Sequence, residues 1–150
     1  MPLDAATILH VEDDDAHAEL VRRELGKAAP RSPVRRVADG AEAIAYLSGE
    51  GPYADRAAHP LPALVLLDLR LPKVDGIGVL RFIKDDEVLR AIPVVMLTSS
   101  DSDRDLSRAY GTHVNSYVVK PLDHLRFREL LSDIARYWME LNANPDRSPA

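Results

Sequence analysis

Apolar runs of strand length alternate with segments of helical period along most of the chain. In the helical segments, apolar residues recur every three or four positions, which is typical of amphipathic helices. Repeated strand and helix units of this kind build a parallel sheet. The sequence therefore predicts an α/β domain, with a five-stranded parallel sheet and helices on both of its faces. The expected strands cover residues 7–11, 34–38, 63–67, 94–97 and 116–119.

The polarity of individual strands predicts their places in the sheet. The strand over 34–38 carries Arg35 and Arg36 and is the least apolar, so we expect it at an edge. The strand over 63–67 is apolar throughout, which is typical of a central strand covered on both faces. Before it, residues 49–62 contain three prolines, two glycines and no clear period, which predicts a long surface loop.

Two helices show a start signal in the form of a capping residue with an acid three positions later. This spacing, in Asp39 with Glu42 and in Ser100 with Asp103, predicts helices that open at Asp39 and Ser100. The third helix is expected to begin near Gly76 and to end before Pro93. The residues that the first four helices should bury are Ala18, Val21, Leu25 and Ala28, then Ala43, Ile44 and Leu47, then Val79, Leu80 and Ile83, and finally Leu106, Ala109 and Tyr110.

The last expected helix carries large apolar residues at alternating spacings of four and three, the pattern of a helix-packing seam. This stripe is first of all a core-facing surface. Because it continues past the expected end of the sheet, it is also a candidate homodimer interface. Its residues are Phe127, Leu131, Ile134, Trp138 and Leu141.

A length of 150 residues with a formal net charge of −5 fits one soluble globular domain. We place this domain at residues 1–142 and interpret 143–150 as a frayed C-terminal tail. The chain has no cysteine, which excludes disulfides and cysteine-based metal sites.

The composition also predicts where the protein works. No apolar run approaches the roughly 18 residues of a membrane span, and the chain does not start with the cationic and apolar segments of a leader. We therefore expect a cytoplasmic protein without membrane contact. Its acidic balance repels phosphate backbones, and it has neither a basic stripe nor zinc-finger spacing, so we expect no nucleic-acid partner.

Polar side chains follow four of the expected strands at the points where those strands end. Because the carboxyl ends of parallel strands meet at one edge of a sheet, these side chains should converge on a single crevice. They are Glu12 and Asp13 (with Asp14 and Asp15 after them), Asp68, Thr98 and Lys120.

Charge limits what such a crevice can hold. Three carboxylates together carry about −3, which would raise at least one pKa unless positive charge intervenes. A divalent cation and Lys120 would supply about +3, and Mg²⁺ fits best because it takes oxygen ligands and keeps several waters. With the cation in place, Asp68 is a candidate nucleophile toward phosphorus, and Thr98 and Lys120 are donors that could meet the phosphoryl group.

At these residues the sequence resembles the receiver domain of two-component response regulators, over nearly the whole chain. Each matching piece is a weak pattern alone, but the order and spacing of the pieces make the joint match specific. The pieces are the acidic cluster in 9–14, the segment 66–72 with Asp75-Gly76, the segment 96–99, and Tyr117-Val118-Val119-Lys120-Pro121. The resemblance implies a flavodoxin-like receiver fold with strand order 2-1-3-4-5.

The resemblance also implies a role for each matching position. Asp68 would accept a phosphoryl group from a sensor histidine kinase, and Thr98 and Lys120 would contact the phosphoryl oxygens. Mg²⁺ would be bound by Asp13 and Asp68 directly, by Glu12 through water and by the backbone carbonyl of Arg70. Tyr117 would be a rotamer switch coupled to Thr98, and the Lys120–Pro121 peptide would be cis.

These roles describe a phosphoacceptor signalling protein that assists its own phosphorylation and dephosphorylation, and not an enzyme. It would switch the surface formed by its fourth helix, fifth strand and fifth helix to signal to a downstream protein. Small amides or acids stand two residues beyond the acceptor and the hydroxyl in receivers that dephosphorylate fast. Arg70 and Ser100 occupy those places here, so the phosphoryl lifetime stays open.

Two further segments resemble the small stand-alone regulators that serve bacterial phytochrome histidine kinases. They are Gly51-Pro52-Tyr53-Ala54, in the long loop, and residues 134–139. This resemblance implies a phytochrome light-sensing pathway. It also implies a homodimer formed through the fourth helix, the fifth strand and the fifth helix.

Other functions remain as alternatives. A scaffold with a vestigial receiver site would keep the fold without the chemistry. An aspartyl-nucleophile phosphatase needs a second aspartate two residues after the nucleophile, where this chain has Arg70. A nucleotide or flavin binder needs an anion cradle after the first strand, where four acids stand instead.

Several of these residues also have simpler interpretations. Asp14 and Asp15 fit as caps of the first helix, Thr98 could cap the fourth helix, and Lys120 could be a surface charge. Tyr117 could be core, switch or both. Of the histidines, His10 should be a packed or surface residue, and His17, His59, His113 and His124 show no ligand spacing.

Overall fold

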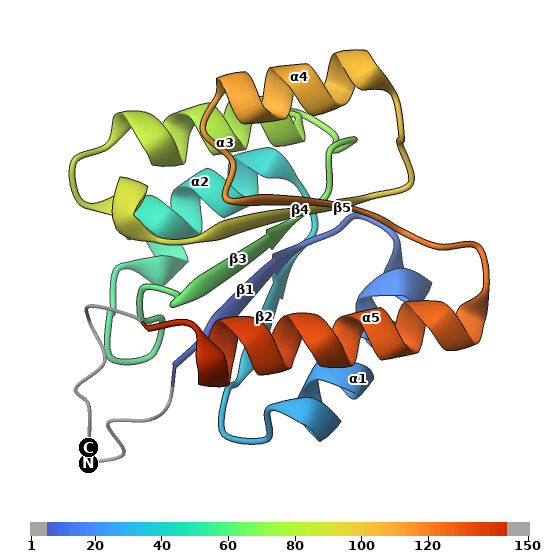
Figure 1. Cartoon of the computed structure of the whole chain (residues 1–150). Coiled ribbons are helices and arrows are strands. Elements are labelled where there is room, and N and C mark those ends of the chain that lie inside the picture. The colour runs from blue at the N-terminus through green and yellow to red at the C-terminus, as the bar shows by residue number, and fades with distance from the viewer. Residues whose placement is uncertain (1–5, 144–150) are drawn as a thin grey trace.

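The computed structural model describes residues 6–143, and within them a single five-stranded parallel sheet in the order β2-β1-β3-β4-β5 (Figure 1). The predicted α/β fold and its strand order 2-1-3-4-5 are confirmed. The strands are β1 (Ile8–Val11), β2 (Val34–Val37), β3 (Leu64–Leu67), β4 (Val94–Thr98) and β5 (Ser116–Val119).

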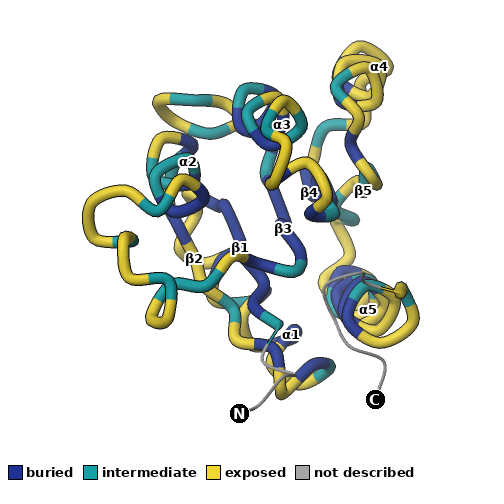
Figure 2. The backbone as a smooth tube through the Cα atoms, turned by 90° about the vertical axis from the view of Figure 1, so that its left-hand side faces the viewer, coloured by how far each residue is buried: buried dark blue, intermediate teal, exposed yellow. Residues whose placement is uncertain are grey.

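Helices cover both faces of this sheet. In Figures 1 and 2, α1 and α5 lie on one face and α2, α3 and α4 on the other. Short 3-10 turns at Gly51–Tyr53 and Leu89–Ala91, and a π-helical turn at Tyr137–Leu141, complete the order of elements. The helices are α1 (Asp15–Ala28), α2 (Gly40–Ser48), α3 (Gly76–Asp85), α4 (Asp103–Gly111) and α5 (His124–Arg136).

Side chains alternate across each strand, so the sheet divides the interior into two apolar cores. On β3, Val65 and Leu67 pack with residues of α2, α3 and α4, whereas Leu64 and Leu66 pack with residues of α1 and α5. All four β3 side chains are fully buried, as predicted for a central strand, and the central strands are dark blue in Figure 2. The strand β2 lies at an edge with Arg35 and Arg36 exposed, as its polarity predicted.

The start signal at Asp39 is confirmed, but the one at Ser100 is wrong. Asp39 is the N-cap of α2 and accepts a hydrogen bond from Glu42 N at 2.7 Å. The N-cap of α4 is Ser102, whose hydroxyl accepts from Asp105 N at 3.3 Å. The Ser102 and Asp105 pair has the same three-residue spacing as the predicted Ser100 and Asp103 pair. The Ser100 hydroxyl instead donates to the Asp105 carboxylate.

The buried stripe predicted for α4 is also wrong in part. Ala109 is buried, but Leu106 and Tyr110 are 37% and 51% exposed. The helix lies over the edge of the sheet beside β5, so only one side of it meets the core, and it is largely yellow in Figure 2. In α2, Ile44 is only half-buried, and Tyr46 fills the core in its place.

The third helix is shorter than expected. It ends at Asp85, and the carboxylate of Asp86 accepts from the backbone of Val88 and Leu89 to start the separate turn before Pro93.

The loop over 49–62 runs on the surface, as predicted, but it is fixed at several points. The guanidinium of Arg56 donates to the carbonyl oxygens of Tyr46 and Leu47, both at 2.7 Å, and so satisfies the end of α2. The rings of Tyr46, Tyr53 and His59 pack against one another with centroids 5.0–6.0 Å apart. The loop therefore packs its aromatic side chains against Tyr46 of α2.

In residues 6–143 we find no helix both long enough and apolar enough to cross a membrane. Apart from Ala143, the tail predicted over 143–150 lies outside the described residues.

Candidate functional site

The candidate site lies where the carboxyl ends of four strands meet, at the right-hand side of the sheet in Figure 1. The backbone pairing continues one residue beyond the strands. Glu12 N donates to Val37 O at 3.0 Å, Asp68 N to Val11 O at 3.1 Å, and Lys120 N to Thr98 O at 2.7 Å. These bonds fix the backbone of the three ionisable residues at one edge of the sheet.

Three carboxylates gather at this edge. Glu12, Asp13 and Asp68 each offer an oxygen, and these oxygens lie within 4.8 Å of one another. The three side chains differ in burial, since Glu12 is 1% exposed, Asp68 is half-buried and Asp13 is exposed. The cluster is therefore closed on the Glu12 side and open to solvent on the Asp13 side.

The ammonium group of Lys120 lies inside the cluster and not on the surface. Its Nζ is 2.8 Å from Glu12 Oε1, 3.7 Å from Asp68 Oδ2 and 3.2 Å from His17 Nδ1. The Lys120 side chain is only 8% exposed. Burial raises the pKa of Glu12, and the hydrogen bond and charge of Lys120 oppose that rise.

The acidic loop is braced from the edge strand. Arg36 Nε donates to Glu12 O at 2.9 Å, and its Nη1 lies 2.7 Å from Asp15 Oδ1. Asp14 N donates to Glu12 Oε2 at 3.2 Å, so the buried Glu12 carboxyl faces the backbone of Asp14. Asp14 also caps α1 by accepting from His17 N, as the simpler interpretation of this residue proposed.

The donor set fits a hard divalent cation. Three carboxylates supply only oxygen ligands, and their charge of about −3 exceeds what one ammonium can offset. The exposed side of Asp13 leaves room for water ligands. These observations support a divalent metal site among the described residues.

Thr98 is buried at the end of β4 and does not cap α4. Its hydroxyl accepts from Ser100 N at 3.3 Å, and its carbonyl accepts from Lys120 N. The neighbouring strand β3 ends at Leu67, so Thr98 lies at the same edge of the sheet as Asp68.

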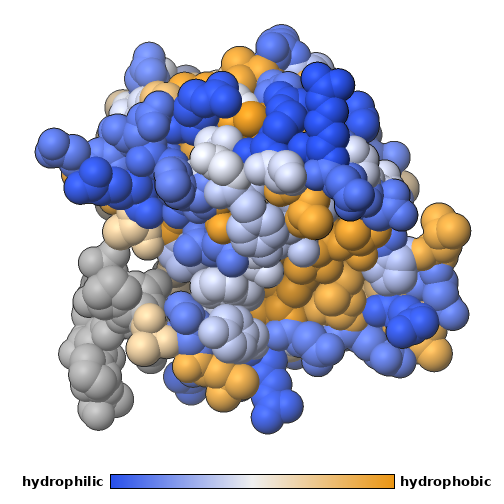
Figure 3. All heavy atoms as spheres, turned by 45° about the horizontal axis from the view of Figure 1, so that its top comes forward, coloured by the Kyte–Doolittle hydropathy of each residue, from blue (hydrophilic) through white to orange (hydrophobic). Residues whose placement is uncertain are grey.

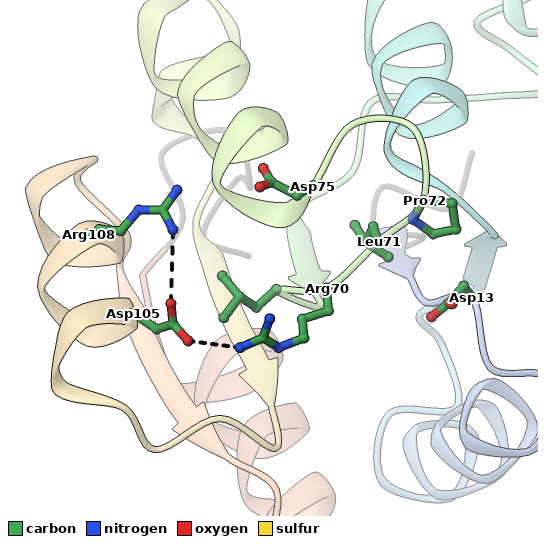
Figure 4. Close-up of a pocket in the computed structure, with 8 residues that line it drawn as sticks. Asp13, Arg70, Leu71, Pro72, Asp75, Asp105 and Arg108 are labelled. Atoms are coloured by element: carbon green, nitrogen blue, oxygen red, sulfur yellow. Dashed lines mark hydrogen bonds and ion pairs between the residues drawn. The ribbon is translucent and has the colours of Figure 1, made fainter.

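A second network runs from β5 to the loop after β3. Tyr117 is half-buried, and its hydroxyl donates to Ser100 O at 2.9 Å. Ser100 Oγ donates to Asp105 Oδ2 at 2.6 Å. Asp105 is also 3.4 Å from Arg70 Nη2 and 4.0 Å from Arg108 Nη1 (Figure 4). This Tyr117–Ser100–Asp105–Arg70 network connects β5, the loop between β4 and α4, the first turn of α4 and the loop after β3.

An open pocket of about 420 Å³ separates this network from the acidic cluster. In Figure 4, Arg70 and Asp105 lie at one side of it and Asp13 at the other. The Arg70 side chain is 78% exposed, while its backbone N lies 3.4 Å from Asp68 Oδ1.

A close approach at Gly76 holds the loop that carries Asp68. Gly76 N donates to Leu69 O at 2.8 Å. A Cβ at Gly76 would lie 2.3 Å from Asp68 O, a distance that real Cβ atoms do not adopt. Asp75 caps α3 by accepting from Gly78 N at 2.9 Å.

The predicted cis peptide at Lys120–Pro121 is wrong. All peptide bonds of the described residues are trans, this one included. The trans form is the lower in energy for most X–Pro bonds. Lys120 already reaches Glu12 from a trans backbone that Thr98 O holds in place.

The stripe predicted as a dimer interface is mostly used inside the chain. Phe127, Leu131 and Ile134 are at most 6% exposed and pack in the core between α1, α5 and the sheet. They have almost no surface left for a second copy. Trp138 is half-buried and Leu141 is 62% exposed, so only these two can contribute.

Comparison with known proteins identifies the family of this chain. The sequence profile of the response regulator receiver domain matches residues 8–132. The chain belongs to the response regulator receiver family. The flavodoxin-like receiver fold expected from the sequence is confirmed.

Two regulatory proteins are similar to this receiver over most of its length. A probable methanogenesis regulatory protein, FilR2 of Methanothrix harundinacea, is 46% identical over 142 residues, which cover 95% of this receiver and 89% of FilR2. Response regulator Rcp1 of Synechocystis is 38% identical over 133 residues, which cover 89% of this receiver and 88% of Rcp1.

Two solved structures of response regulators match the fold of this receiver over most of its length. The phosphorylated cyanobacterial phytochrome response regulator RcpA matches this receiver with a TM-score of 0.88 at 38% identity, over 93% of this chain and 98% of RcpA. The Mn²⁺-bound form of Rcp1 matches with a TM-score of 0.86 at 36% identity, over 93% of this chain and 99% of that one.

Reasoning from the sequence missed three residues of the site. Arg36 was interpreted only as a mark of an edge strand, and Asp105 was not singled out. His17 was set aside because no other histidine stands at ligand spacing. The available signal for His17 was its place in the first turn of the helix that follows the acidic loop.

Proposed function

We propose that this receiver is a stand-alone phosphorylation switch, which accepts a phosphoryl group from a sensor histidine kinase onto Asp68 in a Mg²⁺-dependent reaction. The observation that carries the proposal is the place of Asp68. Its carboxylate is half-buried in the Glu12 and Asp13 cluster, 3.7 Å from the Lys120 ammonium. It is thus a nucleophile beside both a cation site and a fixed positive charge.

The reaction would exchange one bond to phosphorus for another. An oxygen of Asp68 attacks the phosphorus of a phosphohistidine and forms an O–P bond, while the N–P bond breaks and its electron pair stays on the leaving imidazole. A bound divalent cation would neutralise part of the charge on the carboxylates and the phosphoryl oxygens. The chain itself supplies position, because the pairing of Asp68 N with Val11 O fixes the acceptor backbone.

Lys120 and Thr98 would meet the phosphoryl group after transfer. The Lys120 ammonium is buried and already directed at Asp68, so it offers a charge-assisted donor without rearranging. The Thr98 hydroxyl currently accepts from Ser100 N. If it turned to donate to a phosphoryl oxygen, it would pull on the loop between β4 and α4.

The Tyr117–Ser100–Asp105–Arg70 network would carry that pull to the surface. Ser100 connects the Thr98 loop to Tyr117 through its carbonyl and to α4 through its hydroxyl. A change at Thr98 would therefore shift β5 and α4 together. The altered surface of α4, β5 and α5 would bind a downstream protein or a second copy of the chain.

We further propose that the kinase belongs to a phytochrome pathway. RcpA is a phytochrome response regulator, and its structure aligns with 93% of this receiver. The loop with Gly51-Pro52-Tyr53-Ala54, which supports the same proposal, is here fixed by Arg56 and by an aromatic cluster.

The alternative functions have less support. A phosphatase of the aspartyl-nucleophile type needs a second acid two residues beyond Asp68, and Arg70 stands there with its side chain turned to Asp105. A scaffold with a vestigial site would not need a buried Lys120 between Glu12 and Asp68.

Mass spectrometry of the intact protein tests the proposal. Wild type incubated with Mg²⁺ and acetyl phosphate should gain the mass of one phosphoryl group, and chelation of the Mg²⁺ should prevent the gain. Asp68→Asn should stay unmodified, whereas the exposed control Asp85→Asn should behave as wild type. A wild type that takes no phosphoryl group from acetyl phosphate or from a phosphorylated kinase would contradict the proposal and favour the scaffold.

A further inference from the structure

Three acceptors surround the Lys120 ammonium group, and one of them is a histidine outside the acidic cluster. Glu12 Oε1 lies at 2.8 Å, His17 Nδ1 at 3.2 Å and Asp68 Oδ2 at 3.7 Å. An ammonium group has three N–H donors and no acceptor. The contact with His17 is therefore a hydrogen bond only if Nδ1 is unprotonated and the ring proton is on Nε2.

Two contacts place His17, which is otherwise an exposed residue. Its backbone N donates to the carboxylate of Asp14 at 3.0 Å, which places it in the first turn of α1. Its ring packs against Phe127 of α5, with centroids 6.3 Å apart. The imidazole is thus held over the Lys120 side chain, where His17, Lys120 and Phe127 line one pocket of about 320 Å³.

We propose that His17 is a positioning residue for phosphoryl acceptance, which holds the Lys120 ammonium beside Glu12 and directed at Asp68. This inference rests on the proposed function of Asp68. A lysine side chain has four flexible carbons, and one partner leaves its head free to rotate. With Glu12 and His17 each taking one N–H, the third donor points toward Asp68.

Phosphorylation rates of wild type and three variants test the inference. Each protein is treated with acetyl phosphate and saturating Mg²⁺ at pH 8, and the modified fraction is followed by intact mass. His17→Asn keeps an acceptor near the place of Nδ1, while His17→Leu removes the acceptor. His124→Asn is the matched control, since it removes a second imidazole that lines the same pocket.

Wild type and His124→Asn should share one rate. His17→Asn should stay within about twofold of wild type, and His17→Leu should be slower by about tenfold, as expected for one hydrogen bond to a charged group. Rescue by asparagine separates positioning from packing, because leucine fills the space equally well.

A second measurement needs no phosphodonor. Long-range ¹H–¹⁵N correlation spectra at pH 8 should show His17 protonated on Nε2 and bare on Nδ1. A proton on Nδ1, or a His17→Leu variant with the rate of wild type, would overturn this inference alone. A wild type that is never phosphorylated would overturn the proposed function and the inference with it.

Discussion

At the scale of single residues, His10 is the polar side chain least matched to its surroundings. It lies on β1 between Leu9 and Val11 and is 2% exposed. Its Nδ1 has no hydrogen-bond partner within residues 6–143. Burial lowers its pKa to about 3, and the nearby charges of Lys120 and Arg36 act in the same direction. The folded protein therefore holds His10 neutral, with an unpaired polar atom that costs about 1–3 kcal/mol.

This burial predicts a loss of stability in acid that is specific to His10. Above pH 6.5 the ring is neutral in the folded and in the unfolded chain, so it adds no pH dependence. Between pH 6.5 and about 3, only the unfolded chain binds the proton. The free energy of unfolding should then fall by about 1.4 kcal/mol per pH unit on account of this residue.

The substitution His10→Leu should remove this dependence. Urea unfolding at pH 7, 6 and 5 should show a variant at least as stable as wild type at pH 7, with an advantage that grows toward pH 5. The exposed control His124→Gln should keep the slope of wild type. Parallel curves for wild type and His10→Leu would show that the buried ring does not control acid stability.

At the scale of elements, the loop after β3 is set by how closely α3 approaches it. Gly76 lies against the carbonyl of Asp68, where a methyl group would lie 2.3 Å from the oxygen. The contacting atoms belong to the backbone, so no side chain can rotate away to make room.

Gly76→Ala should therefore destabilise the protein by about 1–3 kcal/mol and slow phosphoryl acceptance, because the loop that carries Asp68 must move. Gly26→Ala is the matched control. Gly26 lies inside α1 with nothing within 4 Å of its Cβ position. Alanine there should raise the free energy of unfolding by as much as about 1 kcal/mol. Urea unfolding of both variants measures the contrast, and a Gly76→Ala protein as stable as wild type would refute the close approach.

The start of α4 is held by one carboxylate. Asp105 is 8% exposed and accepts the Ser100 hydroxyl at 2.6 Å, whereas its partner Arg70 is 78% exposed. The short and buried hydrogen bond from Ser100 should therefore contribute more to stability than the pair with Arg70, since exposed ion pairs contribute about 0–1 kcal/mol.

Asp105→Ala should cost about 1–2 kcal/mol and speed amide exchange over residues 99–106, because Ser100 loses its acceptor. Arg70→Ala should change both by much less. Hydrogen exchange followed by mass spectrometry measures the segment, with Asp101→Ala as an exposed control. Equal effects of the Arg70 and Asp105 variants would show that the surface ion pair holds the loop.

The elements also show what the sequence can and cannot predict. Glu12, Asp68, Thr98 and Lys120 follow apolar strands, and parallel strands end at one edge, so their meeting could be derived from order alone. His17 and Asp105 lie in the first turns of helices, where the rotation of the helix decides what a side chain meets. The exposure of Leu106 has a similar cause, since helical spacing does not tell how much of a helix the sheet covers.

At the scale of the whole molecule, the two faces of the sheet differ in how well they are covered. The α1 and α5 face is closed by a continuous core, whereas α4 overhangs the β5 edge. Figure 3, which views the molecule from the side of α4, shows apolar atoms gathered among polar ones. Exposed apolar side chains of α4, β5, the loop after β5 and the start of α5 are Leu106, Tyr110, Val119, Leu122 and Leu125. Such a grouping is typical of a surface that binds a partner.

The homodimer prediction can be tested separately at two regions. One is this exposed apolar surface, and the other is Leu141 at the end of the π-helical turn Tyr137–Leu141. The double variant Leu106→Ser with Tyr110→Ser removes apolar area from α4, and Leu141→Ser does so at the far end, all at exposed positions. Trp138→Ala is less clean, because Trp138 is half-buried and its ring packs at 5.0 Å from that of Tyr137, so the change also affects the fold.

If the dimer forms through α4, β5 and α5, light scattering over a concentration series should show a wild-type dimer. The α4 double variant should raise its dissociation constant by about tenfold or more, as loss of central apolar anchors does. If the seam at the end of α5 is the main contact, Leu141→Ser should have the larger effect. The exposed and distant control Lys27→Ser should leave the dissociation constant unchanged. A wild type that stays monomeric at every concentration, both with and without phosphorylation of Asp68, would assign the exposed apolar surface to a different partner.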